Sequence, residues 1–251
     1  MVWWIAASVC AFFVKGLCGF ANTLVFTTIL SFGSSNASIS PVELLLGYPT
    51  NIILAWKNRK SIQWKVCLPL ALLVIAGSIP GALFLKNADT GIVKLFFGAV
   101  IVLVGVEMLL REFQTRKIKR SKKMKQSKKL KQSKTVLGVI GLLSGLLCGL
   151  YGVGALLGAY ISRVTEDSKS FQANICTVFL AENTFRIGLY AWWGILTLDV
   201  ARQAAMLVPF MLAGLLLGMG SGRFVNERMA KLLVIALLMV SGALLVVQNL
   251  P

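Results

Sequence analysis

Long apolar stretches recur along the chain, separated by short polar segments. The runs VCLPLALLVIAG and IVKLFFGAVIVLVGVEMLL are typical, and they approach the roughly 20 residues that a helix needs to cross a bilayer. No stretch alternates in the manner of a membrane β-strand. The pattern therefore predicts an all-α polytopic membrane protein. We expect full spans at 41–57, 64–86, 91–110, 171–193, 201–219 and 231–250.

Two apolar stretches, 2–32 and 135–162, are too long for one span and too short for two spans joined by a turn. Each has glycines and polar residues near its middle, VKGLCGFANTL in the first and GLLCGLYGVG in the second. Two part-length helices that meet at a break account for both lengths. Because a break leaves backbone polar groups unpaired in lipid, it must be buried in protein or line a watery cavity.

The chain repeats itself on either side of a basic segment. Four features recur in the same order, and together they indicate an internal repeat. This predicts a first transmembrane repeat at 1–110, a basic loop at 111–134 and a second transmembrane repeat at 135–251. The matches are Cys18-Gly19 with Cys148-Gly149, Asn51 with Asn183, Gly77-x-x-x-Gly81 with Gly214-x-x-x-Gly218, and Lys94 with Lys231.

The positions of the basic residues favour a hairpin for each broken element. With hairpins, the loops on one side of the membrane carry 21 Lys and Arg residues and those on the other side carry 3. With single spans the division is 17 against 7, which fits the positive-inside rule less well. A hairpin plus three helices crosses the membrane an odd number of times, so the two repeats are expected to be inverted relative to each other, as in many transporters.

Composition and charge narrow the class of protein further. The 251 residues are 57% hydrophobic and 14% charged, whereas soluble domains have about 25% charged residues. The net charge is +17, and residues 111–134 hold twelve Lys and Arg against one Glu. Such a run can bind nucleic acid or anionic lipid, but the positive-inside rule favours a cytoplasmic loop. We expect a multi-pass protein of the cell (plasma) membrane that contacts lipids and binds no nucleic acid.

Several kinds of chemistry have no support in the sequence. There is no histidine, and the five cysteines form no CxxC pair, so neither a zinc site nor a disulfide framework is expected. We expect no metal and no cofactor. Without an evident nucleophile–base pair or metal cluster, an enzyme is not expected either. The six tryptophans cluster near predicted span ends, which is typical of an interfacial belt.

Two cationic residues, Lys15 and Arg186, lie away from the loops. Charges at membrane depth are costly and commonly functional. Glu182 and Arg186 are four residues apart and share one helix face, so the carboxylate can orient a guanidinium that binds an anion. The alternative is a structural ion pair. Glu43 and Glu107 are candidate proton carriers, although both are expected near helix ends in contact with solvent.

The breaks supply further candidates for anion binding. A helix that starts at mid-depth directs free N–H groups and a positive dipole end into the cavity, and glycines allow a ligand to approach the backbone. Close helix packing is the alternative for these glycines, and it is favoured for the Gly-x-x-x-Gly pairs. Thiols there can touch a sulfur substrate or simply pack, and amides can bind substrate or bridge helices. The candidates are Gly16, Gly19, Gly149, Gly152, Cys18, Cys148, Asn22, Asn51 and Asn183.

Four segments resemble one family of membrane transporters. KGLCGFANTLVFTTIL resembles the opening motif of the TauE/SafE-like sulfite and organosulfur anion permeases, in which Lys-Gly-x-x-Gly-Phe begins the first broken helix. YPTNIILAWKNRKSIQW, GLLCGLYGVGALLGAYI and FQANICTVFLAENTFRIGLYAWWGILT are similar to that family's later segments. The chain departs from the family where a glycine run and a proline are common, because Ala21, Asn22 and Thr28 stand there.

The resemblance implies an inverted-repeat helical transporter for sulfite, thiosulfate or a sulfonate. We therefore expect a secondary transporter that works by alternating access, with protons as a candidate coupling ion. A passive anion channel and a non-transporting membrane interaction protein are the alternatives. The sequence leaves open the exact substrate, the direction of transport, the coupling ion, the oligomeric state, and whether Cys18 and Cys148 touch the substrate.

Overall fold

The computed structural model describes residues 1–30, 34, 36–87, 134–152, 154–165 and 167–221, together with single positions between 95 and 110 and between 232 and 247. Regular structure in these residues is entirely helical, as predicted, with eight α-helices and a short 3-10 helix, Arg59–Ser61. The predicted spans 91–110 and 231–250, Glu107 and nearly all of the basic loop lie outside the described ranges. The helices are α1 (Val2–Cys18), α2 (Asn22–Leu30), α3 (Asn36–Lys57), α4 (Trp64–Asn87), α6 (Lys134–Tyr151), α7 (Ala155–Val164), α8 (Ser168–Trp192) and α9 (Leu198–Ser221).

Both predicted breaks are present in the structure. α1 ends at Cys18 and is followed by Gly19, which adopts a left-handed conformation with φ 85°, and α6 is followed by Gly152 with φ 70°. Glycine reaches these angles without the steric cost that a side chain brings, so each helix can stop abruptly. α2 then runs back along α1. The ring of Phe26 on α2 accordingly packs edge to face on the ring of Trp4, near the start of α1, with the ring centroids 5.8 Å apart.

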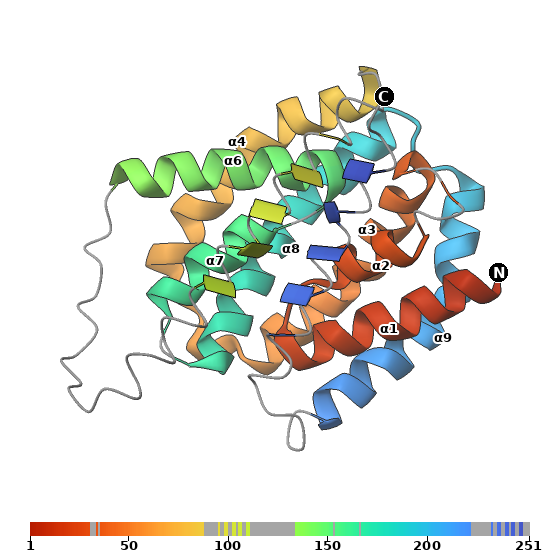
Figure 1. The fold of residues 1–251 in the computed structure, drawn as a ribbon, viewed down its shortest axis with the longest axis horizontal. Helices are drawn as coiled ribbons and strands as arrows, with labels where there is room; N and C mark the ends of the chain where they lie inside the picture. Colours follow the sequence, from red (N-terminus) through yellow and green to blue (C-terminus); the bar gives the residue numbers. More distant parts are fainter. Residues whose placement is uncertain are drawn as a thin grey trace.

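Two close helix pairs enclose a central pair. α1 packs along α9, α4 packs along α6, and α3 packs against α8 between them (Figure 1). Glycines allow the outer pairs to approach closely: a Cβ on Gly77 would lie 2.2 Å from the carbonyl oxygen of Leu142, and one on Gly214 would lie 2.5 Å from that of Val9. Small residues at a helix interface are typical of membrane bundles, so the packing role predicted for the Gly-x-x-x-Gly pairs is confirmed.

These contacts revise one sequence match. A Cβ on Gly218 would lie 3.0 Å from the Cα of Gly16, and one on Gly81 would lie 3.1 Å from the Cα of Gly149. Gly16 and Gly149 thus pack in the same way, and Gly19 and Gly152 are the left-handed residues that follow α1 and α6. The recurrence of Cys-Gly in the sequence matches Gly19 with Gly149 instead, but Gly19 follows the end of α1 whereas Gly149 lies within α6.

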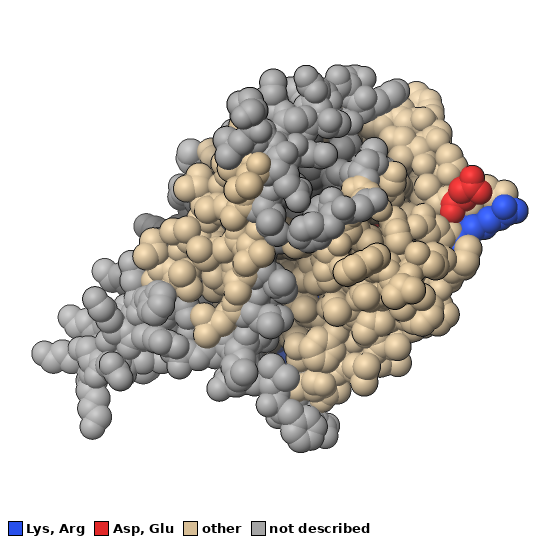
Figure 2. All heavy atoms as spheres, turned by 45° about the vertical axis from the view of Figure 1, so that its right-hand side comes forward, with Lys and Arg blue, Asp and Glu red and all other residues tan. Residues whose placement is uncertain are grey.

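The described surface is largely apolar along the long helices and carries charges such as Arg59, Lys65 and Arg202 near their ends, whereas the interior contains polar side chains. On α4 the exposed residues Leu68, Leu72, Ile79 and Leu83 are all large and hydrophobic. Figure 2 shows a face whose described atoms are almost all uncharged. Among the described residues, Trp64–Leu83 and Leu198–Ser221 are long and apolar enough to cross a membrane, in agreement with two of the predicted spans.

The helices α3 and α8 have the length of a span, with 22 and 25 residues, but they are less apolar than α4 and α9. Their polar residues account for the difference. Glu43 and Asn51 on α3, and Glu182, Asn183 and Arg186 on α8, are all buried. The two central helices therefore carry polar groups into the protein interior, where a ligand site can form.

Candidate functional site

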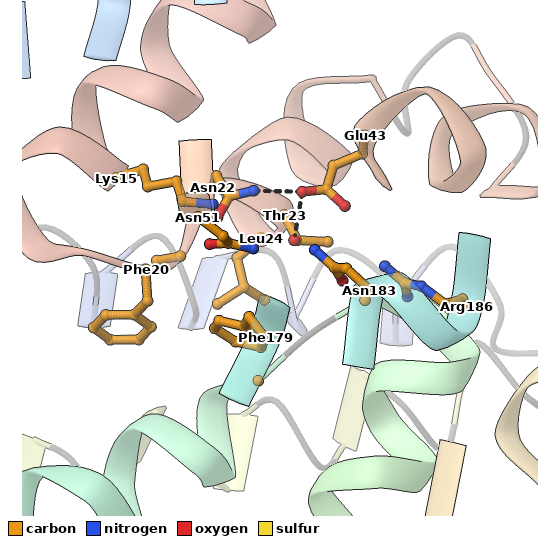
Figure 3. Close-up of a pocket in the computed structure, with 13 residues that line it drawn as sticks. Lys15, Phe20, Asn22, Thr23, Leu24, Glu43, Asn51, Phe179, Asn183 and Arg186 are labelled. Atoms are coloured by element: carbon orange, nitrogen blue, oxygen red, sulfur yellow. Dashed lines mark hydrogen bonds between the residues drawn. The ribbon is translucent and has the colours of Figure 1, made fainter. Parts of the chain in front are cut away.

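A pocket lies where the two breaks meet the central helices. The end of α1, the first turn of α2, the middle of α3, the break after α6 and one face of α8 all contribute to it (Figure 3). It thus combines residues from both halves of the chain. The lining residues are Lys15, Phe20, Ala21, Asn22, Thr23, Leu24, Glu43, Asn51, Gly152, Gly154, Phe179, Asn183 and Arg186.

The two cations singled out in the sequence both line this pocket. Lys15 is 1% exposed and Arg186 is 2% exposed. The Lys15 ammonium donates to the carbonyl oxygen of Gly47 at 3.4 Å, a long hydrogen bond that leaves it further donor capacity. In Figure 3 the two cations lie at opposite sides of the labelled group, with amide side chains between them. An anion placed between them would be attracted from both sides.

Arg186 is held in place by two neighbours. Its Nε lies 3.6 Å from a carboxylate oxygen of Glu182, one helical turn earlier, and its Nη1 donates to the carbonyl oxygen of Cys148 at 2.5 Å. Neither Glu182 nor Cys148 lines the pocket. The predicted pairing of Glu182 with Arg186 is therefore present, and Cys148 contacts the arginine through its backbone.

Glu43 is the acidic member of the site. It is 3% exposed, so the expectation that it lies near a helix end in contact with solvent was wrong. Its Oε1 accepts hydrogen bonds from Nδ2 of Asn22 and from Oγ1 of Thr23, the latter at 2.8 Å. The sequence held a signal for it, since Glu43, Gly47 and Asn51 are spaced four residues apart and follow one face of a helix.

The start of α2 faces the pocket, as predicted for a helix that begins at a break. Residues 21–24 all line the pocket, and the first N–H groups of a helix have no partner within it. Ala21 has φ 74°, a left-handed angle that costs an alanine roughly 1 kcal/mol or more. The left-handed angle therefore places local backbone strain at the pocket.

The second break contributes its backbone more than its side chains. A Cβ on Gly152 would lie 3.0 Å from Nη1 of Arg186, so the guanidinium rests against this glycine. A Cβ on Gly154 would lie 2.2 Å from the ring of Phe179. Sequence reasoning selected Gly152 but did not select Phe20 or Phe179, because apolar side chains in a membrane helix carry no local mark of a site.

Amide side chains complete the polar lining. Asn22, Asn51 and Asn183 all line the pocket, as predicted. Oδ1 of Asn51 is buried and has no hydrogen-bond partner among the residues that the structure describes. A buried unpaired acceptor is costly, so it indicates a place for a water or for a ligand that carries a hydrogen.

The remaining candidates lie outside the lining. Gly16 packs on α9 and Gly149 packs on α4. Cys18 is the last residue of α1, and the carbonyl oxygen of Gly19 accepts a hydrogen bond from the thiol of Cys176. None of Gly16, Cys18, Gly19 and Gly149 lines the pocket. The structure brings together six of the predicted site residues, namely Lys15, Asn22, Asn51, Gly152, Asn183 and Arg186.

The arrangement offers two fixed cations, amide donors and a helix N-terminus within one buried pocket, which is the chemistry that binds a small oxyanion. A family model described as Sulfite exporter TauE/SafE matches residues 4–245, nearly the whole chain. Searches of curated proteins and of solved structures found no match. The chain therefore belongs to the TauE/SafE sulfite exporter family of membrane transporters.

Proposed function

We propose that this protein is a secondary transporter for a small sulfur-containing anion such as sulfite, thiosulfate or a sulfonate. One observation carries the proposal. Lys15 and Arg186, from different halves of the chain, are both buried and line the same pocket. Charged side chains at membrane depth are commonly functional, and the guanidinium of Arg186 has the planar fork that suits an oxyanion.

Each part of the pocket has a role in this mechanism. Lys15 and Arg186 supply positive charge, and the guanidinium presents the planar fork that suits an oxyanion. The N–H groups at the start of α2 and the amides of Asn22, Asn51 and Asn183 supply hydrogen bonds to the remaining oxygens. Glu182 orients the guanidinium through the contact at 3.6 Å. Cys18 and Cys148 do not line the pocket, so neither is given a contact with the substrate.

Alternating access between two inverted repeats is supported by the pairing of the helices. The first helix of each half packs on the fourth described helix of the other half: α1 on α9, and α6 on α4. The central helices α3 and α8 pack on each other. Each contact made by a helix of one half is thus matched by the same contact made by the equivalent helix of the other half. This is the symmetry expected for two repeats that rock about a shared site at the middle of the membrane.

The apolar exterior supports a position in the cell membrane, surrounded by lipid. The positive-inside rule places the basic loop 111–134 and the loop that holds Arg59 and Lys60 on the cytoplasmic side. Near that second loop the Arg59 guanidinium lies 4.9 Å from the ring centroid of Trp56, an exposed aromatic–cationic pair of the kind found at membrane interfaces.

Reconstitution in liposomes tests the proposal. Uptake of sulfite, thiosulfate, sulfate, methanesulfonate and acetate is measured with the purified full-length protein, with and without a pH gradient. Saturable uptake of a sulfur anion that a gradient can drive uphill supports a coupled transporter. Uptake that a gradient cannot drive uphill supports a channel. No uptake of any of these anions contradicts the proposal.

A deletion separates transport from a role in protein interaction. Removing residues 113–133 takes away most of the basic loop without touching the helices that line the pocket. A transporter core should keep its uptake, because none of the pocket residues lies in the deleted segment. Loss of uptake, with the protein still folded and correctly inserted, would show that the loop takes part in the activity.

A further inference from the structure

The charges at the pocket are balanced before any substrate arrives. Lys15 and Arg186 provide two positive charges, and the buried carboxylates of Glu43 and Glu182 provide two negative charges when both are ionised. An anion that leaves water for this site gains little from a neutral cluster, because attraction and repulsion nearly cancel. Binding therefore requires that one of the carboxylates lose its charge or move away.

Glu43 is the carboxylate that obstructs the anion directly. It lines the pocket, whereas Glu182 lies behind Arg186. Its Oε1 already accepts the hydrogen bonds of Asn22 and Thr23, the first two residues of α2. A carboxylate oxygen thus occupies donors that a substrate oxygen would otherwise use at this helix start.

The small volume left in the pocket also indicates that Glu43 obstructs the anion. The cavity has a volume of about 20 Å³, which is room for a water molecule but little more. A substrate with three or four oxygens needs more room than this, and the Glu43 carboxylate is one of the groups that border the space. The charged or titratable neighbours of Glu43 are Lys15 on α1, Glu182 and Arg186 on α8, and Cys148 on α6.

We infer that the Glu43 carboxylate is a built-in competitor of the substrate anion, so that the site binds one proton on Glu43 with each anion that it binds. The inference rests on the proposed transport function and names its coupling residue. Protonation removes one negative charge from the cluster and makes the Glu43 oxygen a weaker acceptor, so that a substrate oxygen can displace it from the donors of Asn22 and Thr23. For a monovalent anion the pair adds no net charge, so the movement of both together is electroneutral.

Binding measured against pH tests this coupling. Isothermal titration of the full-length protein in detergent uses thiosulfate and methanesulfonate, which stay ionised between pH 5 and 8, whereas sulfite itself takes up a proton near neutral pH. In the wild type, affinity should fall by up to about tenfold for each pH unit over which Glu43 ionises. In Glu43→Gln, affinity should equal that of the wild type at low pH and stay constant across the range.

Glu182→Gln is the matched control, because it neutralises the other carboxylate at the site. In this variant the Glu43 carboxylate still accepts the hydrogen bonds of Asn22 and Thr23, so binding should keep its pH dependence although the net charge of the cluster is higher. In liposomes, an acidic exterior should accelerate uptake by the wild type and by Glu182→Gln, but not by Glu43→Gln. Melting temperatures measured on the same samples show whether each variant is folded.

The outcomes separate this inference from the proposed function. Anion affinity that is independent of pH in the wild type, or unchanged pH dependence in Glu43→Gln, overturns the inference and leaves anion transport standing. Loss of binding at every pH in folded Glu43→Gln also overturns it, since Glu43 would then be a ligand and not a competitor. If the wild type binds and transports neither anion at any pH, the inference and the proposed function fail together.

Discussion

Replacing Arg186 separates a structural ion pair from an anion-binding arginine. Both carboxylate oxygens of Glu182 are buried without a hydrogen-bond partner among the described residues, and the guanidinium lies 3.6 Å from one of them. Arg186→Met therefore leaves a buried carboxylate without its ion-pair partner. Arg186→Met combined with Glu182→Leu removes both charges and keeps most of the side-chain volume.

The two variants should differ in stability but not in transport. Removing one partner of a buried ion pair costs about 3–5 kcal/mol, while replacing both partners by apolar residues is often neutral. At about 2–4 °C per kcal/mol, the single variant should melt on the order of 10 °C lower, and the double variant should recover. Losing a charge-assisted hydrogen bond to the anion costs about 1.5–3 kcal/mol, or roughly 10- to 100-fold in affinity, in both variants.

The assay combines thermal melting in detergent with uptake of a sulfur anion in liposomes. Arg202→Met is the matched control, because that arginine is on α9 and its side chain is 66% exposed. The control should leave both the melting temperature and the uptake unchanged. Recovery of uptake along with stability in the double variant would refute the reasoning and leave Arg186 with a structural role alone.

Three further substitutions follow from backbone geometry and capping. Gly152→Ala should reduce uptake strongly in a folded protein, because a backbone φ of 70° disfavours a side chain and the new Cβ would press on the Arg186 guanidinium. Gly188→Ala is the control: a Cβ there would have no atom within 4 Å, so uptake should not change. Gly218→Ala should lower stability by about 2 kcal/mol or more in a denaturation series, since the Cβ would lie 2.2 Å from a carbonyl oxygen of α1. Asp167→Asn should remove the acid sensitivity of the start of α8. The backbone N–H of residue 170 donates to the Asp167 carboxylate and lowers its pKa, so this N-cap is at full strength above about pH 4 and weakens as the pH falls below that value. Amide hydrogen exchange of α8, measured against pH in both proteins, checks this.

The broken helices were predictable from the sequence because length and composition conflict there. An apolar stretch of 31 residues with Gly16, Gly19 and Asn22 at its middle cannot form one straight span, and the structure places the break at Gly19. The position of the second break was harder to predict. Several glycines lie between 145 and 154, and only the helix end at Tyr151 shows that Gly152 is the left-handed residue.

Half of the predicted site residues line the pocket, and each of these six is polar or adopts a special backbone angle. Such residues can be recognised in a membrane segment because they are costly there. Glu43 was noticed but placed near solvent, since its position along α3 depends on a helix start at Asn36 that the sequence does not mark clearly. Phe20 and Phe179 were missed because an aromatic residue at a pocket resembles one facing lipid.

The sequence alone determined the class of the protein, the two breaks in its apolar helices and the presence of costly polar groups within those helices. These properties follow from local composition and periodicity, which the chain carries wherever it folds. The tertiary structure decided which of those groups meet. Lys15 and Arg186 are 171 positions apart. They line one pocket only because α3 and α8 pack against each other at the centre of the bundle, with both helix breaks next to this central pair. The same packing brings Glu43 to the start of α2, a contact between distant side chains that no local pattern encodes.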